Sequence, residues 1–116
     1  MNSLKYLLFI PIYFLMFNQS EAQSKIDTVT FKVQGVCKMC KERIENASLI
    51  KGVKWNEWDK QSRMLTIIYK PKKVSENELH QAVANFGHDT DSVKATTEAY
   101  QKLPMCCEYR EGQETH

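Results

Sequence analysis

The fold of this 116-residue chain is decided by the stretch TVTFKVQGVCKMCKERIENASLIKGV, residues 28–53. Apolar and polar residues alternate at its start, which is the period of a half-buried strand. From Lys38 onward, apolar residues recur at helical spacing and the charged residues fall on the other side. The stretch therefore predicts a strand, a loop that carries Cys37 and Cys40, and a helix over residues 38–50.

The rest of the chain repeats these elements in a recognisable order. Further strands are expected at residues 53–59, 63–69 and, more weakly, 90–95. Ser75 and Glu78 form a capping box that opens a second helix, which Gly87 closes. The order β-α-β-β-α-β, with both helices apolar on one stripe, predicts an α+β fold of ferredoxin-like topology. In this two-layer sandwich, two helices cover one face of a four-stranded antiparallel sheet.

The second helix also gives expectations for single side chains. Its apolar stripe predicts that Leu79, Val83 and Phe86 are buried, whereas His80 lies on the side expected to face solvent.

The N-terminal segment, residues 1–22, has the pattern of a secretory signal peptide. Lys5 precedes an apolar run over residues 6–17, and Ser20 and Ala22 occupy the small-residue positions before a cleavage site. A run of about 12 apolar residues is shorter than the roughly 20 that span a bilayer. We expect a periplasmic or secreted protein without stable membrane insertion after cleavage; the alternative is an uncleaved anchor.

Composition narrows the range of functions. The chain is 42% hydrophobic and 26% charged, which is typical of a globular protein. Its formal charge is 16 − 14 = +2, so we expect no nucleic-acid partner. We expect one small domain over residues 23–95 and a C-terminal tail over residues 96–116. No hydrolytic motif or phosphate-binding glycine loop is present in the sequence, so an enzyme is not expected.

Two cysteines at the start of the first helix carry the chemistry. Cys37 ends the loop and Cys40 lies in the first helical turn, so both sulfurs face one side of that turn. The positive end of the helix favours thiolates, and two thiolates suit a soft ion such as Cu(I), or Zn(II) with further ligands. The four cysteines form two local pairs, and a local disulfide closes almost no loop. The pairs therefore indicate chemistry rather than covalent stabilisation.

At these residues the chain resembles the heavy-metal-associated domain family. That family includes copper chaperones, N-terminal modules of metal-transporting P-type ATPases and the periplasmic mercury-binding protein. The resemblance rests on GVCKMC at 35–40, RIE at 43–45, KGV at 51–53 and FGHD at 86–89. It implies that Cys37 and Cys40 bind one soft metal ion and pass it on by ligand exchange.

The resemblance has departures and additions. The family usually has Met two residues before the first cysteine, where this chain has Gly35, so we expect a more mobile loop. Of Trp55 and Trp58, Trp58 matches an apolar family position and is expected in the core. His88 follows Gly87 in the FGHD motif and is a candidate third metal ligand; the alternative is a surface histidine in a loop.

The tail carries a second soft-ligand group, Met105-Cys106-Cys107. One hypothesis is that the tail folds across the domain and adds Cys106 and Cys107 to the metal site, or holds a second ion. The alternative is a flexible tail with oxidisable thiols that cross-link monomers.

The sequence thus predicts an exported metallochaperone or scavenger for a soft metal ion, with Cu(I) favoured over Zn(II) or Hg(II). A metal-transporting ATPase or another metal-acceptor protein is the expected partner, and Lys38 and Lys41 would orient its acidic face. The protein is expected to be a monomer, or a dimer bridged by metal or disulfide. The alternatives are a periplasmic thiol–disulfide oxidoreductase using Cys37 and Cys40, and a structural or sensory module. Against the former, Val36 stands where thioredoxin-like sites place an aromatic residue.

Overall fold

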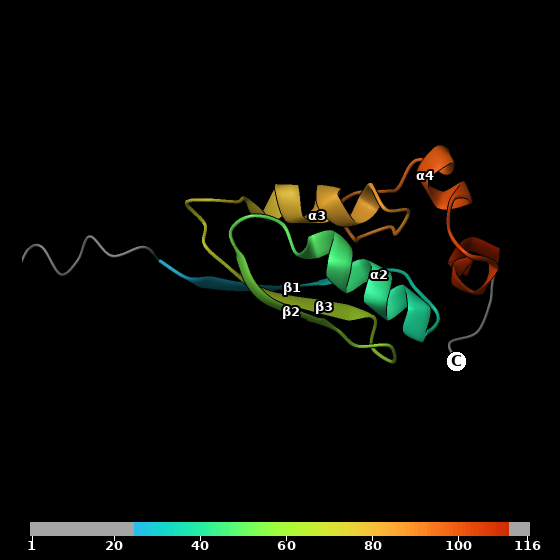
Figure 1. The fold of residues 1–116 in the computed structure, drawn as a ribbon, viewed down its shortest axis with the longest axis horizontal. Coiled ribbons are helices and arrows are strands. Elements are labelled where there is room, and N and C mark those ends of the chain that lie inside the picture. Colours follow the sequence, from blue (N-terminus) through green and yellow to red (C-terminus); the bar gives the residue numbers. More distant parts are fainter. Residues whose placement is uncertain (1–24, 112–116) are drawn as a thin grey trace, which may run out of the picture.

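A computed structural model describes residues 25–111, so the predicted signal peptide lies outside the described residues. Three antiparallel strands form one sheet in the order β1-β3-β2, and two helices cover one of its faces (Figure 1). These elements are β1 (Asp27–Lys32), α2 (Lys38–Ser48), β2 (Val53–Trp58), β3 (Met64–Tyr69) and α3 (Glu76–Ala84). The α+β class and the antiparallel sheet are confirmed, and helix α2 stops two residues earlier than predicted.

The core lies between the sheet and the two helices. Central strand β3 buries Leu65, Ile67 and Tyr69 on its helix side, as the alternation of its residues predicts. Leu65 pairs with Phe31 of β1 on one side and with Trp58 of β2 on the other. All three side chains are at most 3% exposed, so the strand register assembles one continuous apolar layer.

The predicted fourth strand over residues 90–95 does not form in the described chain, and the sheet has three strands. Within residues 90–95, only Thr90 forms a bridge, to Val33, the residue directly after β1. The Thr90 hydroxyl then accepts hydrogen bonds from the backbone N–H groups of Ser92 and Val93, which turns the chain away from the sheet. The turn formed by the Thr90 side chain is therefore more favourable here than the weakly predicted strand over residues 90–95.

The two tryptophans of β2 lie on opposite sides of the sheet. Trp58 is fully buried, as predicted, whereas Trp55 is 46% exposed. The Trp58 indole N–H donates to the carbonyl oxygens of Val33 and Arg63, at 3.1 and 3.2 Å. The polar edge of this large ring is thus satisfied inside the core.

Helix α3 confirms one prediction and corrects two. The capping box of Ser75 and Glu78 is present. His80, expected to face solvent, is 3% exposed, stacks on Phe31 at a ring-centroid distance of 3.7 Å, and its Nδ1 lies 2.6 Å from the Thr90 hydroxyl. Phe86, expected in the core, is 49% exposed because the helix ends at Ala84, so helical spacing no longer sets its direction.

The chain after α3 and its following loop folds back onto the domain as three short helical segments. They are α4 (Thr97–Gln101) and the 3-10 turns η3 (Met105–Cys107) and η4 (Tyr109–Glu111). We call residues 97–111 the strap. It lies at the end of the molecule where helix α2 begins (Figure 1).

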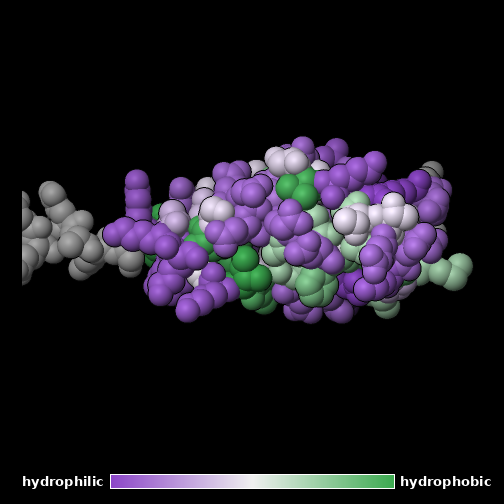
Figure 2. All heavy atoms as spheres, turned by 90° about the horizontal axis from the view of Figure 1, so that it is seen from above, coloured by the Kyte–Doolittle hydropathy of each residue, from purple (hydrophilic) through white to green (hydrophobic). Residues whose placement is uncertain are grey.

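Viewed from the helical side, the surface is largely hydrophilic and its apolar residues form small separate groups (Figure 2). None of the helices in residues 25–111 has the length and hydrophobicity of a membrane-spanning segment.

Candidate metal centre

The site begins at the junction of the loop and helix α2. Cys37 has extended backbone geometry and is the N-cap residue, and Cys40 lies in the first turn. Their sulfur atoms are 3.5 Å apart. Both side chains are buried, Cys37 at 6% exposure and Cys40 at 0%. The strand–loop–helix arrangement predicted for this pair is therefore observed, and the two sulfurs do converge.

The loop rests on Trp58, which explains the glycine at position 35. A Cβ atom on Gly35 would lie 3.0 Å from the Trp58 ring and 3.1 Å from the Cys40 Cβ atom. Both distances are tighter than ordinary van der Waals contact, so a side chain at this position would have to displace a neighbour. Buried Trp58 thus supports the loop from below, and the structure gives a packing reason for the departure from the family pattern.

The strap brings the other two cysteines to the same place. Cys107 is fully buried and forms a disulfide with Cys40, 67 residues away in sequence. The Cys37 sulfur lies 3.5 Å from that of Cys106 and 3.8 Å from that of Cys107. The view of the cysteines as two local pairs is thereby corrected, because the covalent link is long-range and joins the strap to α2. Geometrically, the strap folds across the domain, as one of the two sequence hypotheses expected.

Three sulfurs form a compact group that could hold a soft metal ion. The sulfur atoms of Cys37, Cys40 and Cys107 all lie within 4.8 Å of one another, and all three residues are buried. A disulfide sulfur is not a thiolate, and the thiolate is the metal ligand. This group can therefore act as a ligand set only after the Cys40–Cys107 bond is reduced.

Cys106 lies on the outer side of this group. Its side chain is partly exposed, and its sulfur is 3.7 Å from the sulfur of Met39, which is 48% exposed. Contact with Cys37, followed by burial, raises the pKa of the Cys106 thiol above its usual value. Sulfur atoms thus extend from the surface to the buried group through Met39, Cys106 and Cys37.

His88 is not a surface residue. Its side chain is fully buried, and its Nδ1 lies 2.8 Å from the carbonyl oxygen of Gln34, which identifies Nδ1 as the donor. Burial lowers the pKa of His88 to about 4, so the imidazole is neutral at neutral pH. Nε2 has no hydrogen-bond partner among residues 25–111, and the compact sulfur group does not include it. Metal binding by His88 remains a prediction.

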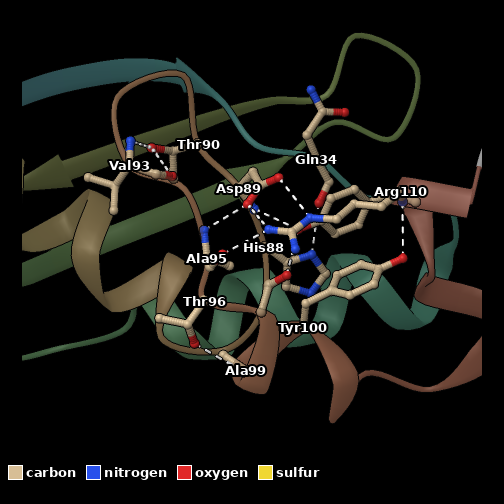
Figure 3. A network of polar contacts seen from close by, with 12 residues as sticks. Gln34, His88, Asp89, Thr90, Val93, Ala95, Thr96, Ala99, Tyr100 and Arg110 are labelled. Carbon is tan, nitrogen blue, oxygen red and sulfur yellow. Dashed lines mark hydrogen bonds and ion pairs between the residues drawn. The ribbon is translucent and has the colours of Figure 1, made fainter.

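An ion pair fastens the strap beside His88 (Figure 3). The Arg110 guanidinium donates to the Asp89 carboxylate, at 2.7 Å for Nη2, and to the carbonyl oxygen of Ala95 at 2.8 Å. Burial acts to raise the pKa of Asp89, but hydrogen bonds from Arg110 and from the Ala95 N–H, with the charge of Arg110, outweigh it and leave the pKa below its ordinary value. The Tyr109 hydroxyl donates to the Gly87 carbonyl oxygen at 2.6 Å.

Sequence reasoning did not identify Asp89, Tyr100, Tyr109 or Arg110 as residues that position the site. Asp89 stands in the quoted FGHD motif, but nothing local in the sequence pairs it with a residue 21 positions later.

The two lysines beside the site differ. Lys41 Nζ lies 2.5 Å from the Glu45 carboxylate and 2.9 Å from the Trp58 carbonyl oxygen, so it links α2 to β2. Lys38 is exposed. Lys41 is therefore engaged within the domain, and a role of Lys38 in orienting a partner stays a prediction.

Compared by sequence, the chain matches no protein-family model and no curated protein. Comparison of structures does find similar proteins. The oxidized MerP from Ralstonia metallidurans CH34 is 26% identical with a TM-score of 0.55, over 58% of this chain and 96% of that one. The Cu(I)-loaded N-terminal domain of a potential copper-translocating P-type ATPase from Bacillus subtilis is 28% identical, with a TM-score of 0.53 over 57% and 85%.

The CopZ metallochaperone is 24% identical with a TM-score of 0.53, over 55% of this chain and 98% of that one, and supports the fold alone. These similar chains share the helix-covered antiparallel sheet described above. The described part of this chain therefore has the heavy-metal-associated fold.

Proposed function

We propose that this protein is a carrier or scavenger of a soft metal ion, and that its reduced form binds Cu(I) through Cys37 and Cys40. The observation that carries this proposal is the 3.5 Å spacing of the two sulfurs at the start of α2. The heavy-metal-associated fold of the domain, shared with a Cu(I)-loaded structure, supports the choice of ion. Thiolates at a helix N-terminus are stabilised by the helix dipole, and Cu(I) prefers soft sulfur ligands.

In this proposal the ion leaves by ligand exchange. A thiolate or thioether of the acceptor enters the coordination shell before Cys37 or Cys40 departs, so the ion is never without sulfur ligands. Cys37 is the more accessible of the two, at 6% exposure against 0% for Cys40, and the half-exposed Met39 lies between them in sequence. We therefore assign Cys37 as the first ligand to be replaced.

We further propose that the protein acts after export, in the periplasm or outside the cell, and delivers its ion to a metal-transporting ATPase or a similar acceptor. The signal-like residues 1–22 support export. Structural similarity to a domain of a potential copper-translocating ATPase supports an acceptor of that class. Exposed Lys38, next to Cys37, would favour an acceptor with acidic residues around its own site.

Anaerobic titration of the purified protein with Cu(I), read by native mass spectrometry, tests the proposal. The protein reduced with dithiothreitol should take up one ion, and the Cys37→Ser and Cys40→Ser variants should bind it at least about tenfold more weakly, a difference of about 1.4 kcal/mol. Met39→Leu preserves size and removes only the thioether, so it serves as the matched control. A reduced protein that takes up no Cu(I) at micromolar concentrations would contradict the proposal.

One observation favours a second function, thiol–disulfide exchange. The Cys37 sulfur lies 3.5 and 3.8 Å from the two sulfurs of the Cys40–Cys107 disulfide, within reach for attack by a thiolate. In that role Cys37 would displace Cys107 from Cys40, or Cys40 from Cys107, and the released thiolate would take up a proton. Insulin-reduction turnover that disappears in Cys37→Ser, without any Cu(I) uptake, would favour this function over metal transfer.

A further inference from the structure

The strap places a third sulfur beside the Cys37–Cys40 pair. We propose that Cys107 is a metal ligand of the reduced protein, so that the ion is held by three thiolates, one of them supplied by the strap. This inference rests on the proposed function, because it concerns the same site. It goes beyond the two-cysteine loop that the family resemblance implies.

The position of Cys107 is built into the fold. Within the strap, Tyr100 and Leu103 are buried at 8% and 6% exposure on either side of the turn that leads to Cys107. A Cβ atom on Gly87 would lie 2.8 Å from the Ala99 carbonyl oxygen, so the strap packs directly against this glycine, whose φ of +101° suits the absence of a side chain.

Polar contacts complete the attachment. Besides its bonds to Asp89 and Ala95, Arg110 stacks over the Tyr100 ring, with its guanidinium carbon 4.5 Å from the ring centroid. The Tyr100 hydroxyl accepts a hydrogen bond from the Arg110 backbone N–H at 3.1 Å. Figure 3 shows that these groups converge from the strap and from the loop after α3. Such contacts do not require the disulfide, so they should hold the strap in place after reduction.

The sulfur spacing fits a single ion. With metal–sulfur bonds of about 2.3 Å, the sulfurs of a tetrahedral site are about 3.8 Å apart, and those of a planar three-sulfur site about 4.0 Å. The Cys37 sulfur already lies 3.5 Å from that of Cys40 and 3.8 Å from that of Cys107. The bonded pair, Cys40 and Cys107, must separate for all three to reach this spacing, whereas the two distances from Cys37 need to change by only about 0.5 Å or less.

Burial distinguishes Cys107 from its neighbour Cys106. Cys107 is fully buried within the compact sulfur group, whereas Cys106 is partly exposed and falls outside it. We therefore assign the third coordination position to Cys107. Substitution by serine is thus expected to weaken Cu(I) binding at Cys107 but not at Cys106.

The Cys40–Cys107 disulfide must be reduced before the metal ion can bind to all three sulfurs. A dithiol reductant gives two electrons and two protons to the Cys40–Cys107 bond and is itself oxidised to a disulfide. The three thiols of Cys37, Cys40 and Cys107 then release their protons to solvent as the ion binds. Oxidation of the site therefore removes two of its three ligands together, and the disulfide and the metal exclude each other.

X-ray absorption spectroscopy of the Cu(I)-loaded, reduced full chain counts the sulfur ligands directly. Three sulfurs are expected in the wild-type protein and in Cys106→Ser, but two in Cys107→Ser. In competition with a Cu(I) chelator, Cys107→Ser should bind at least about tenfold more weakly, whereas Cys106→Ser should stay within about twofold. All comparisons are made in the reduced state, where no variant has the disulfide, so the loss of covalent stabilisation does not enter.

The possible results separate this inference from the proposed function. Two sulfurs in Cu(I)-loaded wild-type protein, or three in Cys107→Ser, would overturn the role of Cys107 and leave Cu(I) binding by the loop intact. No uptake of Cu(I) by the wild-type protein would overturn both. Cys107→Ala provides a second test if a buried serine hydroxyl disturbs the fold, and its circular dichroism spectrum should match that of reduced wild type.

Discussion

The Cys40–Cys107 disulfide should contribute a large part of the stability of the oxidised protein. It joins the first turn of α2 to the strap, across 67 residues of sequence. The perturbation is reduction of this bond with dithiothreitol, which leaves every side chain in place. Because a cross-link stabilises mainly by restricting the unfolded chain, the effect depends on the length of the loop that it closes.

The chain-entropy relation gives the magnitude. For a loop of 67 residues, the bond lowers the entropy of the unfolded chain enough to stabilise the folded state by about 4 kcal/mol at 25 °C. A local bond between Cys37 and Cys40 would give about 2 kcal/mol by the same relation. Since small domains are stable by about 5–15 kcal/mol, the difference between these two pairings is easily measured.

Urea unfolding followed by tryptophan fluorescence is a suitable assay, because Trp58 moves from the core to water on unfolding. With an m-value of about 1–2 kcal/mol/M, reduction should lower the urea midpoint by roughly 2–4 M. Cys106→Ser is the matched control, because it removes a cysteine outside the bond and should respond to reductant as the wild type does. A loss of 2 kcal/mol or less, or peptide mapping that links Cys37 to Cys40, would refute the long-range pairing.

Three further predictions concern the surroundings of the site. The pKa of His88 is lowered to about 4, so between pH 6.5 and pH 4 the unfolded state binds more protons than the folded state. The free energy of unfolding should therefore fall by about 3 kcal/mol as the pH is lowered through this range. Urea unfolding at pH 7 and pH 4.5 measures this pH dependence of the free energy of unfolding, which should be weaker in His88→Gln because the imidazole no longer contributes. An equal pH dependence in the two proteins would contradict the burial of His88. Arg110→Gln removes the ion pair with Asp89 and should lower the free energy of unfolding by about 1–3 kcal/mol. It should also speed the reaction of Cys106 with a thiol reagent, and unaltered thiol reactivity would mean that the ion pair does not hold the strap in place. Ser75→Ala should destabilise the protein by about 1 kcal/mol through loss of the helix cap, and Ser75→Thr should recover most of it; equal unfolding midpoints for all three proteins would rule out the capping contribution.

Much of the fold could be predicted because its signals are local. The alternation in β3 and the helical spacing in α2 depend on residues a few positions apart, and Leu65 and Ile44, which lie on the apolar sides of these two patterns, are both fully buried. The capping box of Ser75 and Glu78 is likewise contained in four residues. Local signals failed where two of them competed, as at Thr90, whose side-chain turn replaced the expected fourth strand.

The sequence by itself determined that Cys37 and Cys40 stand together at the start of a helix, since their spacing of three residues brings them to one side of a helical turn whatever surrounds them. Only the tertiary structure decided that Cys107 bonds to Cys40 and that His88 is buried. These outcomes depend on contacts between residues tens of positions apart, such as the Asp89–Arg110 ion pair that fastens the strap. No short-range periodicity encodes such contacts, because they arise only when the folded surfaces meet.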